Sequence, residues 1–229
     1  MQTGDEVKKA LEIVFKANAD LYKTRGFQRR VGYGKKPALL IIDLANAWTR
    51  PGNAFTCDNM EEIIPTNQKL LEAFRRRGLP IIYTTTAYDV TDRNVPGDMG
   101  LWHMKIPVEV LAAGSEAAAI DSRIAPQKGE HVIVKKRASA FHGTYLSGML
   151  KNMGVDTVIV TGVTAAACVR NTIEDAIADG FRPIAVKEGI GDRIAGAVEW
   201  NLFDIDAKFG DVEPLNKVLA YLDSNDLNV

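Results

Sequence analysis

Apolar and polar residues along this chain form alternating blocks that predict strands and helices in turn. Near-continuous apolar runs, such as "PALLIIDL", are typical of strands buried on both faces of a parallel sheet. We expect strands at 37–44, 80–86, 131–136, 157–162 and 182–189. Apolar residues at helical spacing predict helices at 5–24, 61–77, 143–153, 168–180, 193–202 and 213–222. The alternation predicts a three-layer α/β/α fold with a mostly parallel, Rossmann-like central sheet.

The first predicted helix stands apart from this alternation. Residues 1–27 precede the first strand, and we expect them to form an N-terminal helical extension. Its apolar stripe, which includes Val7 and Leu11, could pack on a neighbouring subunit or on its own domain. No repeat or low-complexity segment interrupts 1–229, so we expect one domain. The least regular stretch is 87–128, and loops of this length inside a compact domain are often functional.

Composition and charge exclude several classes of protein. The 229 residues carry 28 basic and 29 acidic side chains, a net charge of −1, so nothing favours nucleic acid as a partner. Only two cysteines occur, which is typical of a reducing compartment rather than of a disulfide framework. No signal-peptide core is present, and no apolar run approaches the ~20 residues of a membrane span. We therefore expect a cytoplasmic protein that does not bind membranes.

Three chemically active side chains follow three of the predicted strands. Ligands of open α/β sheets bind beyond the carboxyl ends of the strands. The strands at 37–44, 131–136 and 157–162 would deliver Asp43, Lys135 and Cys168 to that edge. Alone, each has a simpler interpretation: a turn cap, a solvated strand end and a buried small residue. Together, at the ends of three parallel strands, they indicate a catalytic site.

The chemistry of this trio is coherent. A helix N-terminus and a nearby ammonium both favour the thiolate form of a cysteine. A carboxylate can take the thiol proton and later return it to a leaving amine. Backbone N–H groups around 164–168 could stabilise an oxyanion at the start of the following helix.

Three blocks of the sequence resemble a known family. The stretches "ALLIIDL", "VIVKKRASAFHGTYL" and "VIVTGVTAAACVRNTIEDA" are similar to those of the isochorismatase-like cysteine hydrolases. Further stretches, such as "EGIGDRIAGAVEWNLFDIDAKFGDV", most resemble the N-carbamoylsarcosine amidase branch. The resemblance runs collinearly over about residues 28–212 and implies the isochorismatase-like fold.

The resemblance implies an Asp-Lys-Cys triad made of Asp43, Lys135 and Cys168. Of the two adjacent lysines, the first occupies the family position, and strand alternation agrees that only one can face the site. The family also has a non-proline cis peptide before the cysteine, here between Val163 and Thr164. This geometry would aim the N–H of Thr164 at the oxyanion beside that of Cys168.

Other positions concern the substrate. The resemblance suggests that Arg193 binds a substrate carboxylate, although a surface arginine in a first helical turn would look the same. Trp102 and Phe55 are candidate pocket walls, and core packing is equally compatible with both. The chain departs from its relatives in two places. Ala165, Ala166 and Ala167 stand where Thr-Ser-Gly is common, and His142 stands where the family often has a second aromatic residue. We expect these positions to alter the substrate preference.

We predict no metal and no cofactor. Nicotinamidases of the same superfamily bind zinc through an aspartate and histidines after the second strand. The corresponding stretch here, "TTTAYDVTDRNVPG", contains no histidine, and His103, His131 and His142 lack ligand spacing.

The expected function is a metal-free amidohydrolase that releases ammonia through a cysteine thioester. An N-carbamoyl amino acid is the favoured substrate, with a maleamate-like half-amide or a nicotinamide-like amide as alternatives. Isochorismate is not expected, because the vinyl-ether hydrolases of that name lack the cysteine. The remaining alternative is a non-catalytic binding module on the same fold. Members of the branch are typically tetramers, so the resemblance implies a homotetramer.

Overall fold

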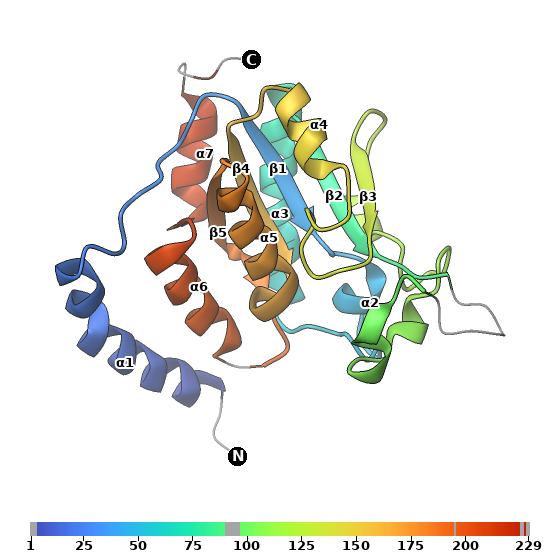
Figure 1. Cartoon of the computed structure of the whole chain (residues 1–229), viewed down its shortest axis with the longest axis horizontal. Helices are drawn as coiled ribbons and strands as arrows, with labels where there is room; N and C mark the ends of the chain where they lie inside the picture. The colour runs from blue at the N-terminus through green and yellow to red at the C-terminus, as the bar shows by residue number, and fades with distance from the viewer. Residues whose placement is uncertain (1–3, 90–96, 195, 225–226, 228–229) are drawn as a thin grey trace.

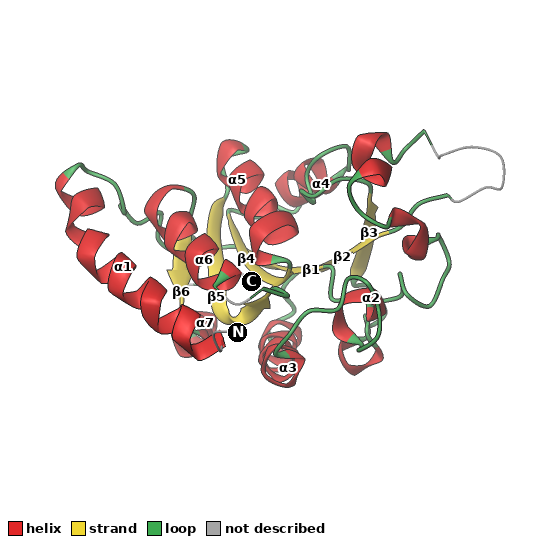
Figure 2. Cartoon of the chain, turned by 90° about the horizontal axis from the view of Figure 1, so that it is seen from below, coloured by secondary structure: helices red, strands yellow, loops and turns green. Residues whose placement is uncertain are grey.

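A six-stranded sheet covered by helices on both faces forms the body of the protein (Figures 1 and 2). The computed structural model describes residues 4–89, 97–194, 196–224 and 227. The strands are β1 (Pro37–Ile42), β2 (Ile81–Thr86), β3 (His131–Lys135), β4 (Thr157–Val163), β5 (Arg182–Gly191) and β6 (Asp211–Glu213). They lie in the order β3-β2-β1-β4-β5-β6, and every ladder is parallel. The predicted three-layer α/β/α architecture is confirmed.

The order of the strands reverses at β1, which lies between β2 and β4. Open α/β sheets bind ligands in the crevice outside such a switch point. Ile42 is level with Gly162 in the β1–β4 ladder, so these two strands end side by side. The segments that follow them, with Asp43 and Cys168, therefore leave the sheet at the same edge.

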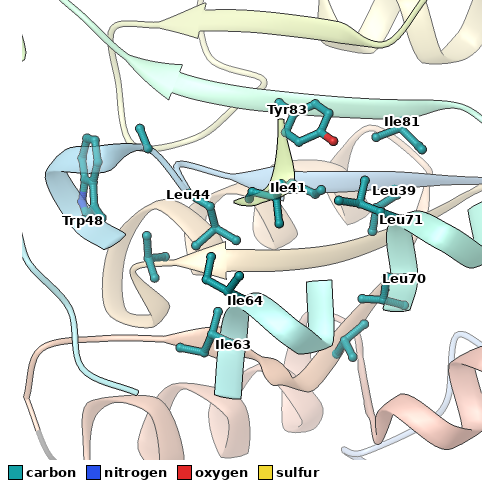
Figure 3. Close-up of a cluster of buried hydrophobic side chains, with 14 of the residues drawn as sticks. Leu39, Ile41, Leu44, Trp48, Ile63, Ile64, Leu70, Leu71, Ile81 and Tyr83 are labelled. Atoms are coloured by element: carbon teal, nitrogen blue, oxygen red, sulfur yellow. The ribbon is translucent and has the colours of Figure 1, made fainter. Parts of the chain in front are cut away.

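The core divides along β1, whose six residues are all buried. Leu39 and Ile41 belong to one apolar cluster, with α3 (Met60–Arg76) and α7 (Leu215–Asp223) (Figure 3). The alternating Ala38, Leu40 and Ile42 belong to the other cluster. The helices that pack on this other face of the sheet are α4 (Leu146–Asn152), α5 (Arg170–Ala178) and α6 (Ala197–Lys208). Burial on both faces explains why the strand has no polar positions.

The N-terminal helix α1 (Gly4–Thr24) lies outside α6 (Figure 1). Phe15 stacks on Phe203 of α6 with ring centroids 4.4 Å apart. Other apolar residues of α1 face solvent, with Ile13 70% and Val14 44% exposed. The apolar stripe thus packs partly on its own domain and leaves a second apolar strip uncovered. No helix in the described part of the chain is long and apolar enough to cross a membrane.

Several elements differ from the expected ones. The helix predicted from residue 193 begins at Ala197, after Gly196 in a left-handed conformation with φ +88°, and continues to Lys208. The helix predicted from residue 168 begins with a π-helical turn, η4 (Ala165–Val169), before α5. The short α2 (Asn46–Thr49) and strand β6 were not predicted. The 87–128 stretch contains 3₁₀ turns η1 (Gly100–Met104), η2 (Val108–Leu111) and η3 (Ser122–Ile124).

Candidate active site

Asp43, Lys135 and Cys168 meet at the switch point of the sheet. The Lys135 ammonium Nζ lies 2.7 Å from Asp43 Oδ2 and 3.4 Å from Cys168 Sγ. The Asp43 and Lys135 side chains are fully buried, and Cys168 is 8% exposed. A carboxylate, an ammonium and a thiol therefore lie in contact in a place shielded from water. The positions of the three strands along the sequence predict this proximity.

Asp43 is held by the neighbouring strand β2. Its φ of +51° is left-handed, a conformation that aspartate adopts more readily than most residues. The Thr84 hydroxyl accepts the Asp43 N–H at 3.1 Å and donates to Oδ1 at 2.8 Å. The Thr86 hydroxyl donates to Oδ2 at 3.4 Å. Both carboxylate oxygens therefore have partners, and the orientation of the carboxylate is fixed.

The ammonium of Lys135 has a full set of acceptors besides the thiol. Nζ donates to the Thr86 hydroxyl at 2.8 Å and to the Arg137 carbonyl at 3.0 Å. Burial alone would lower the pKa of Lys135, but the charge of Asp43 and the sulfur of Cys168 outweigh it and raise that pKa. Lys135 is therefore a permanent cation. Lys136 points elsewhere and pairs with Asp98 Oδ2 at 2.8 Å.

The thiol of Cys168 behaves differently from the sequence-based expectation. Burial raises its pKa above the ordinary value, Lys135 lowers it, and Asp43 raises it again. The net direction of the pKa shift is upward, because burial and the negative charge of Asp43 together outweigh the effect of Lys135. Lys135 therefore lowers the pKa of the Cys168 thiol, as expected, but by less than the other two effects raise it. In the free site the proton stays on sulfur.

The turn before Cys168 is shaped by close contact between backbones. The peptide bond between Val163 and Thr164 is cis. Gly162 has φ +109°, and a Cβ at this position would overlap the Ile42 carbonyl oxygen. Only glycine allows β4 to approach the end of β1 this closely. This contact brings the turn at residues 164–168, which carries the candidate nucleophile Cys168 and is called the nucleophile turn below, beside Asp43.

The N–H groups of the turn are not equally available. The Ala166 N–H donates to Asp192 Oδ2 at 3.0 Å. The Ala167 and Val169 N–H groups both donate to the Thr164 carbonyl at 3.1 Å. None of these three N–H groups is therefore free to hold an oxyanion.

Arg193 lies on the exposed loop after β5. Its guanidinium Nη2 donates to the Phe55 carbonyl at 3.1 Å and lies 4.0 Å from Cys57 Sγ. Phe55 itself is buried in the core against Trp48, with ring centroids 5.1 Å apart. Arg193 and Phe55, two of the candidate substrate-binding residues, are thus neighbours, but the Phe55 ring packs in the hydrophobic core.

The other candidates lie in different settings. Trp102 on η1 is half-buried and contacts both apolar clusters. Ala165 is buried, whereas Ala166 is exposed. His142 lines a separate surface hollow of about 310 Å³ that also involves Asn171 and Glu174.

Four functional contacts escaped the sequence analysis: those of Thr84, Thr86, Thr172 and Asp192. Alternating threonines at the end of the strand beside β1 were a usable signal for the first two. Thr172 donates to the Cys168 carbonyl at 2.6 Å, and nothing in the sequence distinguishes it from any helical threonine.

The described residues contain no group of three or more His, Cys, Asp and Glu side chains that could hold a metal. Residues 90–96 of the stretch compared with the zinc-binding nicotinamidases lie outside the described residues. The prediction of no metal and no cofactor remains a prediction.

Comparison with known proteins finds relatives over most of the chain. The Isochorismatase domain model matches residues 37–216, a range that holds Asp43, Lys135, Cys168 and Arg193. An N-carbamoylsarcosine amidase of Arthrobacter sp. is 57% identical over 215 residues, which cover 93% of this chain and 81% of that protein. A maleamate amidohydrolase of Pseudomonas putida is 39% identical over 185 residues, or 80% of this chain and 85% of that protein. The crystal structure of an N-carbamoylsarcosine amidase from Thermoplasma acidophilum has a TM-score of 0.66 and 26% identity, covering 79% of this chain and 97% of that one.

Proposed function

Because the chain belongs to the isochorismatase family, we propose that it is a cysteine amidohydrolase of N-carbamoyl amino acids such as N-carbamoylsarcosine. The arrangement of Asp43, Lys135 and Cys168 carries this proposal. The relative at 57% identity supports the choice of substrate class. The reaction cleaves a C–N bond with water and releases ammonia.

The first step moves one proton and forms one bond. The free site holds an ionised Asp43, a protonated Lys135 and a neutral Cys168 thiol. As the sulfur attacks the carbonyl carbon, its proton passes to Asp43. The substrate carbonyl oxygen becomes an oxyanion. Lys135, which remains charged, compensates the negative charge that develops on sulfur.

The oxyanion is assigned to the N–H groups of Thr164 and Cys168. The Ala166, Ala167 and Val169 N–H groups are engaged by protein oxygens, which supports this choice. Preorganised backbone donors of this kind contribute several kcal/mol because they need no reorganisation during the reaction.

The second half of the cycle returns the site to its initial state. Asp43 gives its proton to the leaving nitrogen of the tetrahedral adduct, the C–N bond breaks, and ammonia departs. The acylated Cys168 that remains is a thioester, in the form of a thiocarbamate when the substrate is an N-carbamoyl amino acid. Water then attacks the thioester carbon and passes a proton to Asp43. When the C–S bond breaks, that proton returns to sulfur, and the free thiol is restored.

Arg193 is assigned to the substrate carboxylate. A guanidinium can bind a carboxylate through two parallel N–H donors. The carboxylate favours N-carbamoyl amino acids and maleamate-like half-amides over neutral aromatic amides. If Arg193→Ala left KM for the best acidic substrate unchanged, this assignment would be wrong.

Replacement of the nucleophile tests the reaction itself. We expect Cys168→Ala and Cys168→Ser to lose ammonia release from a panel of N-carbamoyl amino acids, maleamate and nicotinamide. The matched control is Cys57→Ser, which changes the other buried cysteine and should keep its turnover. Full turnover by Cys168→Ala would contradict the mechanism. A wild-type protein inactive on the whole panel would favour the non-catalytic binding module.

The assembly and location of the protein belong to the same proposal. We place residues 1–229 in one domain with 1–27 as its extension, assembled as a homotetramer in the cytoplasm. The uncovered apolar strip of α1, with Ile13 70% exposed, supports self-association. The two free cysteines support a reducing compartment.

A further inference from the structure

The carboxylate of Asp192 is a buried charge that the proposed reaction does not use. It follows β5, is 8% exposed, and lines a groove of about 900 Å³ beside the N-terminal helix. The described residues offer it no ion pair. A buried carboxylate without a cation is costly unless hydrogen bonds satisfy it.

One oxygen holds the nucleophile turn. Asp192 Oδ2 accepts the Ala166 N–H at 3.0 Å, midway between Thr164 and Cys168. The turn begins at Thr164, whose own side chain makes no capping hydrogen bond. A capping oxygen normally satisfies the second or third N–H of a helical segment, and Ala166 is the second here. Asp192 therefore caps the turn from another strand.

The other oxygen holds Arg193. Asp192 Oδ1 accepts the Arg193 N–H at 2.8 Å, and the Asp192 carbonyl accepts the Asp58 N–H at 3.1 Å. The Arg193 guanidinium then reaches the Phe55 carbonyl, three residues before Asp58. The backbone from which Arg193 extends is therefore fixed on the same carboxylate as the nucleophile turn.

We propose that Asp192 is a positioning residue that sets the distance between the nucleophile turn and Arg193. It thereby selects substrates by the separation of their carboxylate from the scissile carbonyl. This inference rests on the proposed roles of Cys168 and Arg193. An N-carbamoyl-α-amino acid has a shorter separation than its homologue with one more methylene. The substrate class proposed above consists of α-amino acid derivatives, so the separation that Asp192 maintains should be the shorter one.

The variants Asp192→Asn and Asp192→Glu test the bridge. Asn keeps the shape but leaves one acceptor oxygen for two N–H donors. Glu keeps both oxygens but shifts them by one methylene. For the short substrate we expect Asp192→Asn to lower kcat/KM by about 10- to 100-fold, since displacements near 1 Å have effects of this size. The preference for the short over the long substrate should fall in both variants.

The matched control is Glu62→Gln, which removes an exposed carboxylate from the same groove without touching the turn. It should keep both the rate and the preference. In the double variant Asp192→Asn/Arg193→Ala, the increases in KM should not add, because Asp192 acts on KM through Arg193.

Three results would overturn the inference. One is an Asp192→Asn enzyme that matches Glu62→Gln. A second is an equal loss of rate on both substrates, which would assign Asp192 to general stability. A third is an Asp192→Asn protein without a cooperative thermal transition. Failure of the proposed function itself is seen separately, as turnover retained by Cys168→Ala or an unchanged KM in Arg193→Ala.

Discussion

At the scale of single residues, the site is organised around a buried ion pair rather than a preformed thiolate. Asp43 and Lys135 are 2.7 Å apart, and each balances the other's charge. The thiol beside them keeps its proton, because burial and Asp43 outweigh the effect of Lys135 on its pKa. In the proposed mechanism the nucleophile is therefore generated during the attack, with Asp43 as the base.

Replacing Asp43 should separate thiol reactivity from turnover. Because Asp43 raises the pKa of Cys168, Asp43→Asn should lower that pKa and speed alkylation by iodoacetamide at neutral pH. Asparagine also tolerates the left-handed backbone at this position. Ammonia release should nevertheless be lost, because no base remains.

The measurement is the alkylation rate between pH 6 and 9, followed by mass spectrometry in a Cys57→Ser background. The parent enzyme should show a rate that rises about tenfold per pH unit without a plateau, since its thiol pKa is raised. A plateau below pH 7 in the parent would show that Lys135 dominates and that our interpretation of the site is wrong.

The two adjacent lysines give a matched pair for stability. Lys135→Met leaves Asp43 buried without its cation, a change that costs about 3–5 kcal/mol of unfolding free energy. Lys136→Met removes a partly exposed pair with Asp98, worth about 0–1 kcal/mol, together with a hydrogen bond to the Ala87 carbonyl and a contact with the Tyr88 ring, and it should cost less than Lys135→Met. Urea unfolding followed by circular dichroism checks the difference. Equal losses would mean that the Asp43–Lys135 pair has no special contribution.

At the scale of elements, the approach of β4 to β1 positions Cys168, the proposed nucleophile. The two strands end level with each other, and Gly162 lies against the backbone of Ile42. The turn that follows carries Cys168, so any displacement of β4 moves the sulfur relative to Asp43.

Two glycines with similar backbone angles isolate this contact. Gly162 has φ +109°, and a Cβ added there would overlap the backbone of Ile42, whereas Gly180 has φ +90° and open space around it. Gly180→Ala should cost about 1–2 kcal/mol from backbone strain alone. Gly162→Ala should cost several kcal/mol more and abolish activity. Thermal unfolding and ammonia release measure both effects, and similar melting temperatures would refute the role of the contact.

Most helices and strands could be predicted from the sequence, because the central strands are continuous apolar runs and the helices between them are amphipathic. Strand β6 could not, since Asp211–Glu213 is short and acidic. It is stabilised by a distant partner, as Arg30 pairs with both Asp211 and Glu213. The pattern of neighbouring residues along the chain carries no information about a contact between residues this far apart in the sequence.

The start of α6 was misplaced for a similar reason. Helical spacing continues back to residue 193, but Asp192 and Arg193 are engaged by the nucleophile turn and by Phe55. The positions of Asp43, Lys135 and Cys168 were predictable because each follows a clear strand. Their hydroxyl partners, Thr84 and Thr86, depend on which strand lies next to β1, and topology supplies that information.

At the scale of the whole molecule, α1 packs on the rest of the domain along only part of its apolar surface. Phe15 docks it on α6, while Ile13 and Val14 remain exposed. If this strip joins protomers, Ile13→Asp should reduce the molecular mass measured by light scattering. Lys16→Asp, at an exposed polar position of the same helix, is the control. An unchanged mass for Ile13→Asp would exclude this strip as the contact.

The separation of the triad along the chain also governs when activity arises during folding. Asp43, Lys135 and Cys168 belong to the ends of β1, β3 and β4, and β3 reaches β1 only through β2. Contacts between segments this distant form late, because loops must close first. A growing chain that has formed only β1 and β2 has the Asp43 carboxylate and its Thr84 and Thr86 partners, but neither the cation nor the thiol. Regain of ammonia release on refolding should therefore mark completion of the sheet, and it should follow the burial of Trp48, which is 4% exposed in the folded protein.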